Sequence, residues 1–159
     1  AVCYDIGCGS GSISVEMAML SPGIRVYAID SVEEAVALTR KNADRFGLKN
    51  VQVVQGMAPE GMENFPEPTH AFIGGSRGNM AAILKNLYAK NPSMRVVINA
   101  ISLETLSEIM GCLKTWKVTD LDITQVQISK AKTLGAYHMM MGQNPVYIIS
   151  AGGRKPGQV

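Results

Sequence analysis

The sequence of 159 residues contains no apolar run close to the roughly 18 residues that a helix needs to cross a bilayer. It has three cysteines, and their spacing fits neither a disulfide framework nor a set of metal ligands. The N-terminus does not look like a secretory signal peptide, because it lacks a basic region and soon reaches the charged Asp5. These absences favour a cytoplasmic domain that holds no metal.

The net charge of +2 is too small to predict binding to nucleic acid or to a membrane surface. The positive charge is nevertheless uneven, since Lys130, Lys132 and the pair Arg154-Lys155 all follow the last acidic residue, Asp122. Two interpretations remain open, namely an anionic partner near this end of the chain or a solvated basic tail.

Apolar residues make up 47% of the chain, which supports a packed core in a single domain. Strand and helix patterns then alternate along the chain up to residue 115. Strands are predicted at 2–6, 25–30, 51–55, 70–73 and 95–101, and helical segments at 12–20, 32–46, 59–63, 79–90 and 103–115. This alternation predicts a parallel sheet with helices on both faces.

The last third predicts two strands, at 121–128 and 146–150, joined by a long loop and paired as an antiparallel hairpin. In the first strand the apolar residues change parity between Ile123 and Val126, which predicts a bulge. A nicotinamide-binding domain would end on a sixth parallel strand instead. We therefore expect a Rossmann-like α/β domain over 1–151, with a seven-stranded, mostly parallel sheet, and a flexible tail over 152–159.

The strongest functional motif is Asp5-Ile6-Gly7-Cys8-Gly9-Ser10-Gly11, which lies where the first strand turns into the first helix. Glycines let a ligand approach the main chain, and the helix N-terminus presents free N–H groups. The dinucleotide fingerprint fails because Ser12 stands where its last glycine or alanine belongs. A carboxylate at Asp5 suits an ammonium group and would repel a pyrophosphate.

Two further turns complete the predicted cofactor site. Asp30, with Ser31 beside it, ends the second strand, where a carboxylate can accept hydrogen bonds from both hydroxyls of a ribose. The alternative is a cap on the following helix. By resemblance to the class I methyltransferases, the turn after the third strand lies along the edge of an adenine ring. An acid often stands at the position of Met57 in that family, and here Met57 can instead pack on the ring face, with Gly56 beside it and the backbone of Ala58 at the ring edge. The alternative there is an ordinary turn between a strand and a helix.

The fourth strand ends in a glycine-rich segment that includes Gly75, Ser76 and Arg77. Ligands of parallel sheets bind outside the carboxyl ends of the strands, so these residues are candidates for binding a second substrate. The glycines leave room for a large flat molecule, and Arg77 and exposed N–H groups suit its carboxylates. A flexible turn with an exposed arginine is the alternative.

The acid and glycine loop at 5–11 resemble motif I of the class I methyltransferases, in which they hold the amino-acid end of S-adenosylmethionine. Several segments together are similar to the decarboxylating precorrin methyltransferases of cobalamin biosynthesis, over nearly the whole chain. These segments are 5–16, 56–60 (Gly-Met-Ala-Pro-Glu), 73–78 (Ile-Gly-Gly-Ser-Arg-Gly), 99–105 (Asn-Ala-Ile-Ser-Leu-Glu-Thr) and 143–149 (Gln-Asn-Pro-Val-Tyr-Ile-Ile).

This resemblance implies S-adenosyl-L-methionine as cofactor, S-adenosylhomocysteine as product, and an anionic tetrapyrrole of the precorrin-6Y type as substrate. The family methylates position 15 and decarboxylates an acetate side chain. It also implies a homo-oligomer, often a tetramer, and in some organisms fusion to a second methyltransferase domain.

Candidates for holding the substrate's carboxylates are Arg77, Lys130, Lys132 and His138. The two lysines share a strand face if the strand extends that far, and His138 is placed in the long loop before the final strand. No catalytic residue is assigned, because an electron-rich carbon needs no dedicated base to attack a methyl group.

Three other functions remain open from the sequence. One is a different class I methyltransferase acting on a small molecule. RNA is disfavoured as its acceptor by the weak net charge. The exocyclic amines of bases are disfavoured because the sequence has no Asn-Pro-Pro-Tyr or Asp-Pro-Pro-Tyr segment. Another is a cofactor-binding domain that is inactive without a partner segment. A nicotinamide enzyme is the third, and the failed fingerprint and the terminal hairpin disfavour it.

Overall fold

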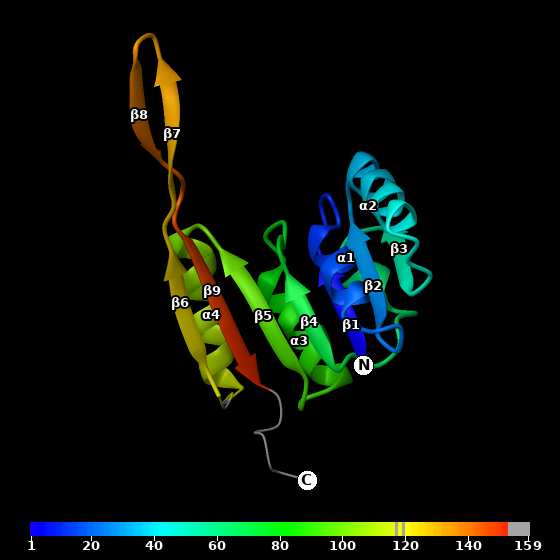
Figure 1. Ribbon diagram of the computed structural model, residues 1–159. Helices are drawn as coiled ribbons and strands as arrows, with labels where there is room; N and C mark the ends of the chain where they lie inside the picture. The colour runs from blue at the N-terminus through cyan, green and yellow to red at the C-terminus, as the bar shows by residue number, and fades with distance from the viewer. Residues whose placement is uncertain (117, 119, 153–159) are drawn as a thin grey trace.

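The computed structural model describes residues 1–116, 118 and 120–152, and its centre is a seven-stranded sheet (Figure 1). The strand order is β3-β2-β1-β4-β5-β9-β6, with parallel pairing from β3 to β5 and with β9 antiparallel to both β5 and β6. The predicted α/β architecture is therefore confirmed. The elements are β1 (Val2–Ile6), α1 (Ser12–Met19), β2 (Arg25–Asp30), α2 (Glu33–Arg45), β3 (Val51–Gln55), η1 (Glu60–Met62), β4 (His70–Ile73), α3 (Met80–Lys90), β5 (Arg95–Ala100), α4 (Leu103–Thr115), β6 (Asp122–Val126), β7 (Ser129–Leu134), β8 (Tyr137–Gly142) and β9 (Val146–Gly152).

Helices cover both faces of this sheet. α1 and α2 lie on one face near β1, β2 and β3, while α3 and α4 lie on the opposite face (Figure 1). The larger core packs the sheet against α3 and α4 and includes the buried Ile83, Leu87 and Ile109. A smaller cluster of Cys3, Ala18 and Val26 lies beneath α1. Packing of helices on both faces thus holds the sheet in place. The predicted motifs lie at the ends of its strands.

The observed boundaries differ from the predicted ones by at most two residues. β9 ends at Gly152, just past the predicted domain boundary, and residues 153–159 of the predicted tail lie outside the described part of the chain. No helix within the described residues is long and apolar enough to span a membrane.

The prediction of a loop between the last two long strands is wrong. The chain instead continues into β7 and β8, which pair as an antiparallel ribbon with Lys130 opposite Met141 and Thr133 opposite His138. All residues of both strands are exposed. A strand buried on neither face shows no alternation of apolar and polar residues, so the sequence gives no period-2 signal here.

The predicted bulge in β6 is also wrong, because β6 pairs with β9 in one continuous register from Asp122–Ser150 to Val126–Val146. β6 is the edge strand of the sheet, and every residue in it is exposed. Without a buried face, nothing requires its apolar residues to keep one parity.

The β7–β8 ribbon extends away from the body of the molecule, beyond the edge of the sheet at which β4 and β5 end (Figure 1). It forms a two-stranded sheet of its own. The strands of the ribbon consequently pack only against each other and not against the hydrophobic core.

Candidate functional site

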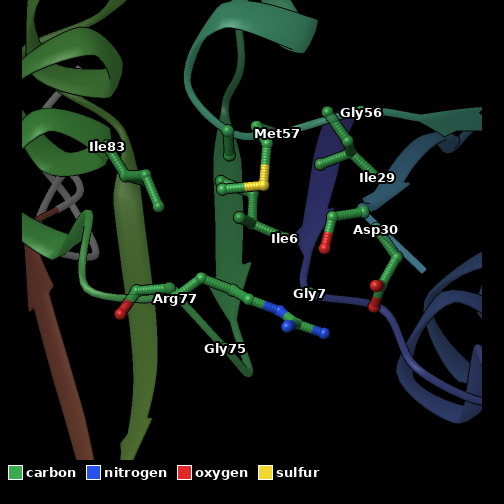
Figure 2. A pocket seen from close by; sticks show the side chains of 12 residues that line it. Ile6, Gly7, Ile29, Asp30, Gly56, Met57, Gly75, Arg77 and Ile83 are labelled. Atoms are coloured by element: carbon green, nitrogen blue, oxygen red, sulfur yellow. The ribbon is translucent and has the colours of Figure 1, made fainter.

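A cavity of about 220 Å³ lies at the carboxyl ends of β1, β2 and β4 (Figure 2). Its wall combines strand ends, the turns that follow them and one helix residue: Ile6, Gly7, Ile29, Asp30, Ser31, Gly56, Met57, Ala58, Gly75, Ser76, Arg77 and Ile83. The chain runs outwards from β1 to β2 and β3, and then returns to β4 on the other side of β1. Parallel sheets bind their ligands at such a reversal of strand order.

Two glycines allow the turns after β1 and β4 to pass close to each other. Gly7 has a φ of +71°, and a Cβ atom on it would lie 2.6 Å from the carbonyl oxygen of Gly75. The N–H of Gly74 donates to the carbonyl oxygen of Ile6 at 2.9 Å. Any side chain at Gly7 would push apart the two turns that share this wall.

The rest of the glycine loop lies beside the cavity rather than in its wall. Cys8, Gly9, Ser10 and Gly11 lead from β1 into α1. The N–H of Gly9 donates to a carboxylate oxygen of Asp30 at 3.0 Å. This hydrogen bond ties the loop to the end of β2, so the loop and Asp30 form one continuous surface.

Both carboxylate oxygens of Asp30 accept backbone hydrogen bonds, one from Gly9 and the other from Val32, each at 3.0 Å. The alternative that Asp30 or Ser31 caps the next helix is wrong, because Val32 is the N-cap residue of α2 and no side chain caps it. Each carboxylate oxygen has a second lone pair. Asp30 can therefore still accept hydrogen bonds from a ribose in the cavity.

The structure places Asp5 beneath the glycine loop rather than in the cavity wall. Its side chain has no exposed surface, and its Oδ1 atom has no hydrogen-bond partner within the described residues. Its carboxylate accepts a hydrogen bond from the Ser14 hydroxyl of α1. Asp5 thus supports the loop and the start of α1 from below, a direction that the sequence motif alone does not reveal.

The turn after β3 closes the next side of the cavity. Met57 is 44% exposed, and its side chain points into the cavity (Figure 2). The carbonyl oxygen of Ala58 accepts a hydrogen bond from the Asn79 amide at 3.2 Å, which joins this turn to the segment before α3. Met57 can therefore pack on a planar ring held above β2 and β3.

Gly75, Ser76 and Arg77 lie on the β4 side of the cavity. Arg77 has a φ of +49°, a left-handed backbone that is uncommon for residues with a side chain. Its side chain extends across the cavity towards Gly7 and Asp30 (Figure 2). Within the described residues its guanidinium takes part in no ion pair. It is thus available to a carboxylate of a ligand.

The structure does not bring Lys130, Lys132 and His138 to this cavity within one chain. The lysines do share a face of β7, and His138 lies on β8 rather than in a loop. The ribbon continues from β6 and β9, and β5 separates these strands from the cavity-lining β4 (Figure 1).

Three wall residues, Ile6, Ile29 and Ile83, are not among the residues predicted to bind the cofactor or the substrate. Ile6 and Ile29 stand at the ends of β1 and β2, so their position next to the motifs is a usable signal. Ile83 comes from α3 and reaches the cavity only through the tertiary fold. Among the described residues no group of three or more side chains could hold a metal ion.

Comparison with known proteins agrees with this geometry. A family model described as a precorrin methyltransferase domain matches residues 1–152. A protein of Pyrobaculum calidifontis named probable cobalt-precorrin-6B C(15)-methyltransferase (decarboxylating) is 38% identical over 152 residues, which are 94% of this chain and 77% of that protein.

Two solved structures are similar as well. The precorrin-6y C5,15-methyltransferase of Geobacter metallireducens has a TM-score of 0.85 and 34% identity, with 95% of this chain and 79% of that chain covered. The precorrin 8w decarboxylase of Methanobacterium thermoautotrophicum has a TM-score of 0.82 and 38% identity, with 95% and 81% covered.

The strand order and the glycine loop after β1 define the class, since this is the fold of the S-adenosylmethionine-dependent methyltransferases of class I, and this chain is such an enzyme. The family match narrows the assignment because it extends over every described residue. The chain belongs to the precorrin methyltransferase family.

The buried Asp5 makes a testable contribution to stability. Burial raises the pKa of its carboxyl from 3.8 to about 6, against the opposing effect of the Ser14 hydrogen bond. The folded state therefore favours the protonated carboxyl. The stabilisation that this preference gives is complete below about pH 4 and is lost as pH rises through 6. Because Asn carries no charge at any pH, we expect the free energy of unfolding of Asp5→Asn to rise relative to that of the wild type by up to about 3 kcal/mol between pH 4 and pH 7. Urea unfolding of both proteins across this range measures the difference, and parallel pH profiles would contradict it.

Proposed function

We propose that this chain methylates carbon 15 of a corrin precursor of the precorrin-6Y type and removes carbon dioxide from an acetate side chain. One similar protein is named a C(15)-methyltransferase (decarboxylating) and another a precorrin-6y C5,15-methyltransferase, and the similarity extends over nearly the whole chain. The observation that carries the proposal is the division of one cavity wall: Asp30 and Met57 suit an adenosine, and Arg77 opposite them suits an acceptor with carboxylates.

S-adenosylmethionine is the proposed cofactor, and the wall residues fit it. Asp30 would accept hydrogen bonds from the ribose, Met57 would pack on the adenine, and the loop that begins at Gly7 would hold the amino-acid end. When bound, the cofactor supplies an electrophilic methyl group on a sulfonium.

The cavity of about 220 Å³ is below the ~300 Å³ usual for such ligands, and the Arg77 side chain takes up part of the space (Figure 2). We expect Arg77 to turn towards the acceptor when the cofactor binds.

The acceptor is proposed to lie over the carboxyl ends of β4 and β5. Ile101 and Leu103, which follow β5, are 69% and 70% exposed. From β4 to β6 the sheet spans three strand spacings, or roughly 15 Å. A tetrapyrrole fits this breadth with its flat face on the two apolar side chains and its carboxylates near Arg77.

The protein's task in both chemical steps is to position the substrate and to balance its charge. Alignment of carbon 15 behind the methyl group can lower the barrier by about 7–11 kcal/mol in favourable cases. In the decarboxylation, the bond between the acetate methylene and its carboxylate breaks, carbon dioxide leaves, and the electron pair passes into the conjugated macrocycle. A proton taken up from solvent then converts the methylene into a methyl group. Arg77 would hold a carboxylate that is retained, and no residue is needed as a base.

The cofactor proposal predicts selective binding. In a calorimetric titration of the purified domain we expect saturable binding of S-adenosylhomocysteine and none of NAD, because Asp5-Ile6-Gly7 opens a loop that lacks the dinucleotide fingerprint. Binding of NAD alone would contradict the proposal. Methyl gain and carbon dioxide loss on the corrin precursor then test the acceptor.

Arg77→Ala is expected to raise KM for the corrin precursor by roughly 10- to 100-fold, the value of one charge-assisted hydrogen bond. The affinity for S-adenosylhomocysteine should stay within about twofold of the wild type, because the acceptor rather than the cofactor needs this guanidinium. Arg77→Lys serves as the control, because it keeps the positive charge but loses the paired N–H donors with which a guanidinium binds a carboxylate. A weaker cofactor affinity with an unchanged KM would assign Arg77 to the cofactor instead.

We further propose that the β7–β8 ribbon joins copies of this chain into an oligomer. Leu134, Tyr137 and Met139 lie on one face of the ribbon and are 49%, 74% and 50% exposed. A two-stranded ribbon is at best marginally stable alone in water, and clustered apolar side chains of this kind mark protein contacts. Lys130 and Lys132 share that face, so in an oligomer they can approach a substrate held by a neighbouring copy.

Replacing Leu134, Tyr137 and Met139 together by serine tests this contact. Sedimentation equilibrium should show the wild type as an oligomer and the variant as a smaller species, because the variant loses the apolar face. Binding of S-adenosylhomocysteine by the variant shows that the domain remains folded. Equal masses for the two proteins would contradict the proposed interface.

A further inference from the structure

The three buried polar or charged side chains among the described residues, Asp5, Ser14 and Thr39, all lie around the glycine loop. Asp5 and Ser14 are bonded to each other beneath it. Thr39 belongs to α2, on the buried stripe that it shares with Val36 and Ala43. A buried polar group costs free energy unless it is hydrogen-bonded. The hydrogen bonds of the Thr39 hydroxyl therefore indicate its role.

α2 holds two consecutive carbonyl groups of the loop. The Thr39 hydroxyl donates to the carbonyl oxygen of Gly9 at 3.1 Å. One turn further along the same helix, the Asn42 amide donates to the carbonyl oxygen of Ser10 at 2.8 Å. Residues three apart on a helix lie on one face, so α2 presents both donors to the loop together.

The packing of Thr39 against the loop does not by itself require a hydroxyl. A Cβ atom on Gly11 would lie 2.6 Å from the Thr39 methyl carbon and 2.7 Å from its hydroxyl oxygen, so glycine is the residue that fits there. The Cys8 thiol lies 3.4 Å from the same oxygen. Valine would fill this space equally well, and what it would lack is the donor to Gly9.

The clamped carbonyls determine where the loop's N–H groups point. In a trans peptide the N–H is antiparallel to the preceding carbonyl, so the N–H of Ser10 points away from α2. The neighbouring N–H groups are engaged, that of Gly9 with Asp30 and that of Gly11 with the Cys8 carbonyl. No acceptor within the described residues takes the Ser10 N–H.

We propose that Thr39 and Asn42 are positioning residues, which hold the glycine loop so that the Ser10 N–H meets the carboxylate at the amino-acid end of S-adenosylmethionine. The inference rests on the proposed binding of this cofactor, with its ribose at Asp30. It adds that the affinity for the amino-acid end depends on two side chains of α2 that do not line the cavity.

Thr39→Val tests the clamp with little change of shape. We expect a roughly tenfold weaker affinity for S-adenosylhomocysteine, equivalent to one hydrogen bond. The affinity for methylthioadenosine, which lacks the amino acid, should not change. Thr39→Ser keeps the hydroxyl and should restore most of the affinity. Thr115→Val is the matched control, because the Thr115 hydroxyl bonds only to Gly111 in its own helix, α4.

Asn42→Ala provides an independent test at a partly exposed position, where loss of folding is not expected. This substitution too should weaken the binding of S-adenosylhomocysteine and leave the affinity for methylthioadenosine unchanged. Equal weakening of both ligands, or a change only in the urea midpoint of the ligand-free protein, would overturn the inference and leave these residues a structural role. Failure of the wild type to bind S-adenosylhomocysteine would instead refute the proposed cofactor.

Discussion

The contact between the backbones of Gly7 and Gly75 sets the shape of the site. β1 is paired with β2 on one side and β4 on the other, so the turns leaving β1 and β4 must pass each other at the edge of the sheet. They do so because neither carries a side chain at the crossing. The contact makes the end of β2, with Asp30, and the turn with Arg77 face the same space. A methyl donor and its acceptor need this arrangement.

Around that crossing, the loop is fixed by polar groups that are otherwise costly to bury. Asp5 and Ser14 lie below it, Asp30 holds one of its N–H groups, and Thr39 and Asn42 hold two of its carbonyls. A loop held on several sides binds a ligand without first having to be ordered, which lowers the entropic cost of binding. The same loop would otherwise be a flexible glycine-rich turn.

The fold and the strand-end motifs can be predicted from the sequence because they depend on local pattern. Buried strands, helical stripes and the glycine loop each leave a signal within a few residues, and Asp30, Met57 and Arg77 follow strand ends directly. The direction of the Asp5 side chain and the contacts of Thr39 depend on packing between distant segments. The ribbon leaves no local signal either, because neither of its faces is buried within a single chain.

The most direct test of the central claim, that one cavity receives adenosine on the β2–β3 side and presents the methyl group to the β4 side, is a crystal structure of the complex with S-adenosylhomocysteine. We predict ribose hydroxyls within hydrogen-bond distance of Asp30, about 2.6–3.2 Å, and the sulfur atom facing Gly75 and Arg77. A complex in which the ribose makes no contact with Asp30, or in which the ligand occupies the apolar cavity between α1 and β4 that includes Ile13, Met17 and Phe72, would contradict it.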